Sequence, residues 1–406
     1  MHRITYRVKV SSKNARRRIR KFVGKTRGGM STTSKPAVFN RYTPNKFAIN
    51  KWSTTKKIVQ LSSIALLSLP AKSLTIMDTE TPAYARVMLE NTLTIASTPN
   101  DSTFFAIDNF QHGFGYDLTR SYANELGVKL NLKAYPSDAA ALAAVKRGEA
   151  DMALTTSSTQ EITKFDLASM NLSCGQDANL TANGLHPKIS WTFASANDPL
   201  SKKASHFICD NAKLANTQKL AVFYNQNLLK DAYNQEHFAK ALTDKLPNYQ
   251  SSFKEQADQY NHDWAVLVAM GYQESHLNAN AVSPTGVEGL MMLTNSTAKA
   301  MGVSNRVDPM QSISGGARYL EEMKEQFADV PDADRLWFAL AAYNMGPNAV
   351  KSIQAKIDKK GRDPNSWSNV YAYLTDNAAS NSRYVQCMHY VSNIRSYLES
   401  IKTQTV

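Results

Sequence analysis

The stretch Asp263–Leu277 reads DWAVLVAMGYQESHL and decides how the C-terminal half of the chain folds. Its residues Trp264–Met270 are all apolar, and a helix that is apolar on every side belongs in the middle of a domain. Glu274 follows one turn later, on the face of Leu267 and Gly271. Burial disfavours a carboxylate and raises its pKa, as a general acid working near neutral pH requires. Taken alone, such a glutamate is more often structural, so its context has to decide.

The context is an ordered series of motifs. Residues 283–291 read SPTGVEGLM, and Pro284, Gly286 and Gly289 predict a tight turn before a helix that starts near Leu290. Residues 341–347 read AAYNMGP and place a tyrosine and an asparagine at the end of a helix. Arg-Tyr-Val follows at 383–385.

This series resembles the catalytic domain of the soluble lytic transglycosylases, which is related to goose-type lysozyme. The resemblance covers about residues 255–400. It implies an all-α, lysozyme-like domain that cleaves the β-1,4 bond between N-acetylmuramic acid and N-acetylglucosamine in peptidoglycan. Glu274 matches the single catalytic acid/base. The matches to the family's substrate-binding positions are Ser283, which holds an N-acetyl group, Met291, Tyr343, Asn344 and Tyr384. The family's usual Gln after Gly-Leu-Met is replaced by Met292, which removes one hydrogen bond to the sugar.

The chemistry implied needs one carboxylic acid. Ordinary glycosidases use two carboxyl groups, whereas Glu288 and Asp308, the next acids after Glu274 in the sequence, match no catalytic position. In this family the substrate's N-acetyl oxygen traps the reacting carbon, and its own C6 hydroxyl then closes a 1,6-anhydromuramyl end. The resemblance implies no metal and no organic cofactor. Two alternatives stay open, a non-catalytic or weakly active peptidoglycan-binding scaffold, and hydrolysis in place of transglycosylation.

The segment before this domain alternates between strand and helix patterns. It predicts a parallel β-α-β-α-β sheet through Thr92–Ser97, Tyr116–Leu126 (ended by Gly127), Val128–Ala134, Ser137–Lys146 and Asp151–Thr155. Residues 90–228 resemble the first lobe of family 3 periplasmic solute-binding proteins. Only about 33 residues separate Thr156 from Ile189, so the second lobe is expected to be reduced. Thr155–Thr163 lacks the arginine that grips an amino-acid ligand in that family, and a muropeptide ligand is our hypothesis instead.

The expected fold is therefore a shortened α/β lobe followed by an all-α domain. The expected segments are a leader over 1–73, a linker over 74–90, the lobe over 91–228, a helical connector over 229–260 and the catalytic domain over 261–401. Helices in the last segment are expected at Asp263–Leu277, Ser312–Phe327, Asp334–Met345, Asn348–Ile357 and Ser382–Ile401. His276 is expected at the surface, and Trp337, Phe338 and Leu340 in the core.

The charge distribution indicates export. Residues 1–57 hold 17 Lys and Arg and no Asp or Glu, whereas the remaining 349 residues hold 30 basic and 34 acidic side chains. The net charge of +13 thus belongs to the leader, which argues against nucleic-acid binding by the folded part. Ile58–Leu69 is a short apolar run behind Lys56 and Lys57, typical of a secretory signal. An uncleaved anchor or a buried strand is the alternative.

We therefore expect a periplasmic protein, peripheral at the outer membrane of a Gram-negative bacterium, with peptidoglycan as partner. The chain has three cysteines. In an oxidising compartment Cys174 and Cys209 can pair and leave Cys387 as a buried thiol, but the sequence does not decide between pairing and free thiols.

Overall fold

The computed structural model describes residues 82–404 except 101, 109, 183–188 and 226–227. All of them lie in one compact unit, 76–406. The predicted leader, its signal segment and residues 74–81 of the predicted linker fall outside the described residues. The described end of that linker is not a linker, because Ala83–Glu90 forms helix α1, which buries Val87 and ends at Asn91 in the left-handed conformation. Among the described residues, no helix combines the length and apolar character that a membrane span needs.

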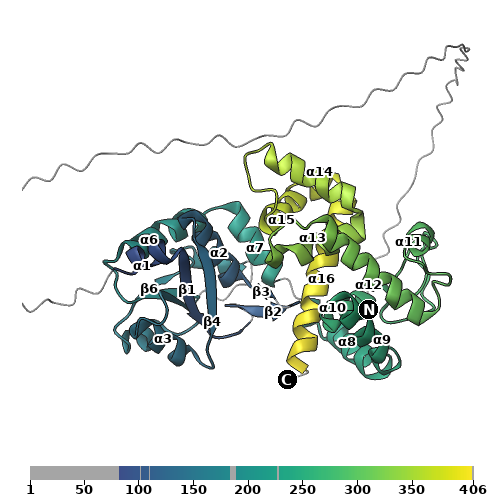
Figure 1. Cartoon of the computed structure of the whole chain (residues 1–406), viewed down its shortest axis with the longest axis horizontal. Helices are drawn as coiled ribbons and strands as arrows, with labels where there is room; N and C mark the ends of the chain where they lie inside the picture. Colours follow the sequence, from purple (N-terminus) through teal and green to yellow (C-terminus); the bar gives the residue numbers. More distant parts are fainter. Residues whose placement is uncertain (1–81, 101, 109, 183–188, 226–227, 405–406) are drawn as a thin grey trace, which may run out of the picture. The chain divides into compact units, whose positions relative to one another are not determined.

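A five-stranded sheet with the order β4-β1-β5-β7-β6 forms the N-terminal part of this unit, at the left of the view (Figure 1). Strands β1 (Thr92–Ser97), β4 (Lys129–Ala134) and β5 (Met152–Thr155) are parallel, as the alternation predicted. Strand β7 (Ser190–Phe193) runs antiparallel to β5 and to β6 (Ala168–Asn171). The sheet is therefore mixed, with two strands that the parallel pattern did not predict.

Helices and a hairpin connect these strands. The helices are α2 (Phe114–Leu126), α3 (Asp138–Lys146), α4 (Thr159–Thr163), α5 (Asp177–Ala182), α6 (Pro199–Ala212) and α7 (Ala215–Asn225). The hairpin consists of β2 (Phe105–Ile107) and β3 (Phe110–His112). Ser137 caps α3 through its side chain, and Gly127 ends α2 with a φ of 72°, both as predicted. The likeness of this segment to a solute-binding lobe stays a prediction.

The question that the sequence left open about the cysteines has an answer in the structure. Cys174, just after β6, forms a disulfide with Cys209 in α6, with the two Cα atoms 5.1 Å apart. Cys387 is a free, buried thiol. The disulfide therefore links the segment after edge strand β6 to the helix that follows its neighbour β7.

The rest of the unit is helical, as predicted. Its elements are η1 (Leu228–Lys230), α8 (Ala232–Asp244), η2 (Leu246–Asn248), α9 (Gln250–Tyr260), α10 (Trp264–Ser275), α11 (Asn295–Ala300), α12 (Pro309–Gln326), α13 (Asp332–Met345), α14 (Pro347–Asp358), α15 (Trp367–Asp376), η3 (Ala378–Ser380) and α16 (Ser382–Gln404). One expectation was wrong, and one helix was missed. No helix starts at Leu290, because a turn occupies 289–292 and α11 begins only at Asn295. Helix α15 was not predicted.

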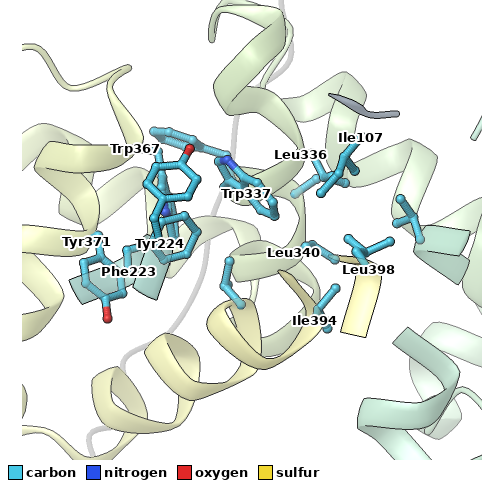
Figure 2. Close-up of a cluster of buried hydrophobic side chains, with 14 of the residues drawn as sticks. Ile107, Phe223, Tyr224, Leu336, Trp337, Leu340, Trp367, Tyr371, Ile394 and Leu398 are labelled. Carbon is cyan, nitrogen blue, oxygen red and sulfur yellow. The ribbon is translucent and has the colours of Figure 1, made fainter. Parts of the chain in front are cut away.

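An aromatic cluster gives the sheet segment and the helical segment one core (Figure 2). Phe223 of α7 lies with its ring centroid 5.5 Å from that of Trp337 in α13 and 5.8 Å from that of Trp367 in α15. The Trp337 ring also meets His112 of β3 edge to face, with the centroids 4.9 Å apart. Trp337 and Phe223 are fully buried. We refer to these four rings as the aromatic joint.

We predict that Trp337→Ala lowers the unfolding free energy of the whole unit by about 3–5 kcal/mol. The substitution leaves a cavity between the sheet segment and the helical segment, both of which pack against this ring. Urea unfolding followed by circular dichroism measures the change. Tyr233→Ala is the matched control, since Tyr233 is 65% exposed and its loss should change stability by less than about 0.5 kcal/mol. Equal stability of the two variants would contradict a shared core.

Candidate active site

Helix α10 is enclosed over almost its whole length. Asp263 caps its start by accepting a hydrogen bond from the Ala265 amide at 3.0 Å, and every residue over 265–272 is buried. The helix ends because His276 and Leu277 both adopt the left-handed conformation, with φ of 53° and 55°. Its last turn therefore delivers Glu274 to the border between the core and an open pocket.

The Glu274 carboxyl is surrounded by protein although a part of the residue reaches solvent. Desolvation raises its pKa from an ordinary 4.5 to about 7, and a hydrogen bond opposes part of this rise. That bond comes from the Tyr390 hydroxyl, which donates to Glu274 Oε1 at 2.7 Å. Burial also raises the pKa of Tyr390 well above its usual value, so the phenol stays a neutral donor. Near neutral pH this carboxyl can both give and take a proton.

The loop after α10 forms one wall of the pocket. Two hydrogen bonds between Ser283 and Val287 close its turn. The Ser283 amide donates to the Val287 carbonyl at 2.8 Å, and Ser283 Oγ accepts from the Val287 amide at 2.9 Å. Gly289 has a φ of 88°, and a Cβ there would lie 1.9 Å from the Arg306 carbonyl oxygen, so only glycine fits. The tight turn predicted from Pro284 and the two glycines is confirmed.

Arg306 ties this loop to the start of α12. Its Nη1 donates to the Leu293 carbonyl at 2.9 Å and its Nη2 to Glu288 Oε2 at 3.0 Å. Asp308 is engaged elsewhere, as the cap that accepts from the Gln311 amide at 2.9 Å. The next two acids after Glu274 in the sequence therefore serve the loop and a helix end, and neither lines the pocket.

Helix α13 supplies another part of the wall. Its Tyr343 hydroxyl donates to the Met291 carbonyl at 3.0 Å, which joins the helix to the loop. Its end is held by Arg383 of α16, whose Nη2 donates to the Met345 carbonyl at 2.8 Å. Burial raises the pKa of Tyr343 well above its usual value, with the Glu274 charge as the next cause. Tyr343 is thus a neutral side chain that shares its surroundings with the acid.

These elements enclose a pocket of about 680 Å³. Its lining residues are Gln273, Glu274, Ser283, Thr285, Val287, Met292, Thr294, Tyr343, Asn344, Gln386, His389 and Tyr390. The structure thus brings together four of the six predicted site residues: Glu274, Ser283, Tyr343 and Asn344. Within the described part of the chain, Glu274 is the only carboxylic acid among the lining residues.

Met291 does not line the pocket. Its side chain is fully buried and packs on Gly316, where a Cβ would lie 2.8 Å from three Met291 atoms. Its backbone is what reaches the site, through the carbonyl that binds Tyr343 and through an amide that donates to Ser312 Oγ at 3.1 Å. Met291 therefore holds the wall in place from behind.

Tyr384 is also absent from the lining, because its ring meets Tyr373 with the centroids 6.0 Å apart. The side chains of α16 that do line the pocket are Gln386, His389 and Tyr390. They share one face by their i, i+3 and i+4 spacing, whereas Tyr384 lies six residues before Tyr390 and projects to another side. Helical spacing groups these three residues on one face, but it does not say which face of α16 meets the pocket.

His276 and the core predictions agree with the structure. His276 is exposed at the end of α10, its ring stacked on Tyr272 with the centroids 4.9 Å apart, and it does not line the pocket. Trp337, Phe338 and Leu340 are fully buried. Across the described residues, no three His, Cys, Asp or Glu side chains are placed to hold a metal ion together.

Comparison with known proteins identifies a family in the helical segment of the chain. Residues 251–365 match the family model described as the Transglycosylase SLT domain. The chain is 41% identical over 222 residues to a membrane-bound lytic murein transglycosylase F of Pseudomonas fluorescens, a match that covers 52% of this chain and 46% of the relative. A relative of the same name from Stutzerimonas stutzeri is 36% identical over 267 residues, or 63% of this chain and 54% of the relative.

One match covers more of the chain. Membrane-bound lytic murein transglycosylase F 1 of Alkalilimnicola ehrlichii is 28% identical in an alignment that covers 79% of this chain and 85% of the relative. The first two matches span about half the length of the relatives. The resemblance predicted from the motifs is thus confirmed, and the chain is similar to the membrane-bound lytic murein transglycosylases F, with a segment that matches the Transglycosylase SLT domain.

Proposed function

We propose that the chain is a lytic transglycosylase that cleaves the β-1,4 bond between N-acetylmuramic acid and N-acetylglucosamine with Glu274 as the only acid/base. One observation carries the proposal. Glu274 is the single carboxyl among the described lining residues, and its pKa of about 7 lets it work in both protonation states at neutral pH. Tyr343, which resembles a cleft tyrosine of the family, lines the same pocket.

The first half of the reaction uses Glu274 as an acid. Because Oε1 accepts the Tyr390 hydrogen bond, the proton of the neutral carboxyl sits on Oε2 and is available to the pocket. That proton passes to the glycosidic oxygen as its bond to C1 of the muramic residue breaks. The acetamido oxygen of the same sugar forms a bond to C1 and stabilises the positive charge there. The N-acetylglucosamine side leaves as a neutral alcohol.

The second half uses Glu274 as a base. Its carboxylate removes the proton from the C6 hydroxyl of the muramic residue, and O6 attacks C1 and displaces the acetamido oxygen. The product has a 1,6-anhydro ring, Glu274 is protonated again, and no water is consumed. Enzymes with two catalytic carboxyls need the second as nucleophile or base, and here the substrate fills that role.

The remaining pocket residues bind the glycan in this proposal. Ser283 and Asn344 present a hydroxyl and an amide for the substrate's N-acetyl and hydroxyl groups, and Tyr343 lines the cleft beside the acid. Met291 contributes through the backbone carbonyl that orients Tyr343, not through contact with the sugar. Tyr390 is a positioning residue, because it acts on Glu274. No cofactor is part of the scheme.

We also propose that the protein is exported to the periplasm and lies at the outer membrane.

We further propose that the N-terminal lobe regulates cleavage by binding a muropeptide. One contact between this lobe and the helical segment supports such a role. Arg120 of α2 donates to Asp334, in the first turn of α13, at 2.9 Å. A muropeptide that does not change the melting temperature of the protein would contradict the lobe's proposed role.

We predict that Glu274→Gln lowers the release of soluble products from purified peptidoglycan by at least about 10²–10⁴-fold, because acid/base assistance is lost. Mass analysis of the wild-type products tests the reaction itself, since anhydro ends weigh one water less than hydrolytic ends. Glu255→Gln is the control, an identical change at an exposed position of α9. A wild-type protein that binds peptidoglycan without cleaving it would favour the scaffold function.

We predict that kcat/KM falls above about pH 7, roughly tenfold per pH unit, as Glu274 loses its proton. Tyr390→Phe should lower activity by about 3–10-fold and move this limb to higher pH, because the lost hydrogen bond is one that lowers the pKa. Tyr384→Phe should leave the position of the limb unchanged. An unmoved limb in Tyr390→Phe would mean that the phenol does not act on the acid.

We predict that Glu274→Gln is more stable than the wild type at pH 8 and gains less at pH 5. In the unfolded chain the carboxyl ionises near 4.5 and in the folded protein near 7, so the folded state loses stability as pH rises between these values. Glutamine removes this cost, which is on the order of 1–3 kcal/mol for a partly exposed group. Unfolding free energies at both pH values measure it. A gain that does not depend on pH would argue against a raised pKa.

A further inference from the structure

Met292 has an unusual backbone for a side chain of its size. Its φ is 47°, in the left-handed region that favours glycine, and its amide donates to the Gly289 carbonyl at 3.2 Å. Its neighbours Leu290, Met291 and Leu293 are buried in the core, whereas Met292 is half-buried and lines the pocket. The left-handed backbone at Met292 therefore accompanies a change of direction: among residues 290–293, only its side chain lines the pocket of Glu274.

Glycine would adopt this conformation without cost, and the same loop uses glycine at two other left-handed positions, Gly286 and Gly289. A strained residue in a pocket points to a role for its side chain. Of the described lining residues, only Val287 and Met292 are purely apolar, and the others carry hydroxyl, amide, carboxyl, phenol or imidazole groups. Met292 is the longer and more adaptable of the two.

An apolar contact in a polar sugar cleft selects for the apolar part of the ligand. In a glycan built from N-acetylated sugars that part is the acetamido methyl group. Removal of the acetyl group leaves an ammonium group on the sugar. Beside the Met292 thioether this ammonium would lose water without gaining a hydrogen-bond acceptor or a negative charge from that side chain. Glu274 is neutral below pH 7 and offers no full charge in compensation.

We propose that Met292 is a specificity residue whose thioether contacts an acetamido methyl of the bound glycan, so that the cleft discriminates against de-N-acetylated sugars. This inference rests on the proposed function, because it assumes that the pocket binds an amino-sugar glycan. It concerns a position where the chain departs from the usual Gln of the soluble lytic transglycosylase domain that the sequence resembles.

The test compares the dissociation constants of two ligands for several variants of the full chain, measured by titration calorimetry at pH 6. The ligands are the N-acetylglucosamine tetramer and the fully de-N-acetylated tetramer. All variants carry Glu274→Gln to prevent cleavage, alone or with Met292→Ala, Met292→Gly or Met310→Ala. Met310 is the matched control, a methionine that is 47% exposed at the start of α12 and lies outside the pocket.

Met292→Ala should weaken binding of the acetylated tetramer by roughly three- to fivefold, the value of one buried methyl contact, and leave the other tetramer unchanged. The ratio of the two dissociation constants should shrink by the same factor, and Met310→Ala should leave it unchanged. Met292→Gly should show the same ratio and melt at a higher temperature than Met292→Ala, so it provides the test if alanine impairs folding.

The outcomes separate this inference from the proposed function. If the Glu274→Gln protein binds the acetylated tetramer and trimming Met292 leaves the ratio unchanged, the role of Met292 is wrong and the function stands. If no variant binds either tetramer and the wild type releases no anhydro products, the proposed function fails and the inference fails with it.

Discussion

The site depends on the enclosure of helix α10. A helix whose residues are buried from Ala265 to Tyr272 has no solvent-facing side on which to place a charge, so the carboxyl near its end is desolvated by the same packing that stabilises the fold. The approach is close, since a Cβ on Gly271 would lie 2.9 Å from Leu290 and 3.1 Å from Phe253. Core stability and the raised pKa of Glu274 therefore have one cause, and a mutation that loosens this packing changes both.

The other walls are held together by hydrogen bonds that each join a side chain to a backbone atom. Tyr343 binds the carbonyl of Met291, the amide of Met291 binds Ser312, and Arg383 binds the carbonyl at the end of α13. Several motif residues are thus scaffolding, and the side chains that face the pocket alternate with them along the chain. The hydrogen bonds that hold this part of the loop come from Met291, beside Met292. The backbone bonds do not involve its side chain.

The sequence was most informative where a side chain's role follows from its own segment. The burial of Glu274, the turn at Ser283 and the end of α2 at Gly127 are local consequences of composition, and the structure agrees with them. It was least informative where the role depends on rotation about a helix axis or on distant partners. Tyr384 and Tyr390 lie on one helix, and only the packing of α16 on α10 decides which of them meets the acid. The antiparallel edge of the sheet and helix α15 likewise depend on contacts between segments far apart in the chain.

The aromatic joint adds a constraint on how the two halves of the unit work together. Phe223 of α7 packs against Trp337, and Trp337 lies on the same helix as Tyr343, less than two turns away. Arg395 of α16, the helix that carries Tyr390, lies over the Phe223 ring at 5.6 Å. The Phe223 ring, which belongs to the segment with the sheet, therefore contacts both of the helices that bring tyrosines to the pocket of Glu274. Since close-packed interiors transmit small displacements and do not absorb them, a shift of α7 relative to the helical segment has to move α13 or α16. Those two helices carry Tyr343 and Tyr390, so the sheet segment and the lining of the pocket share one core.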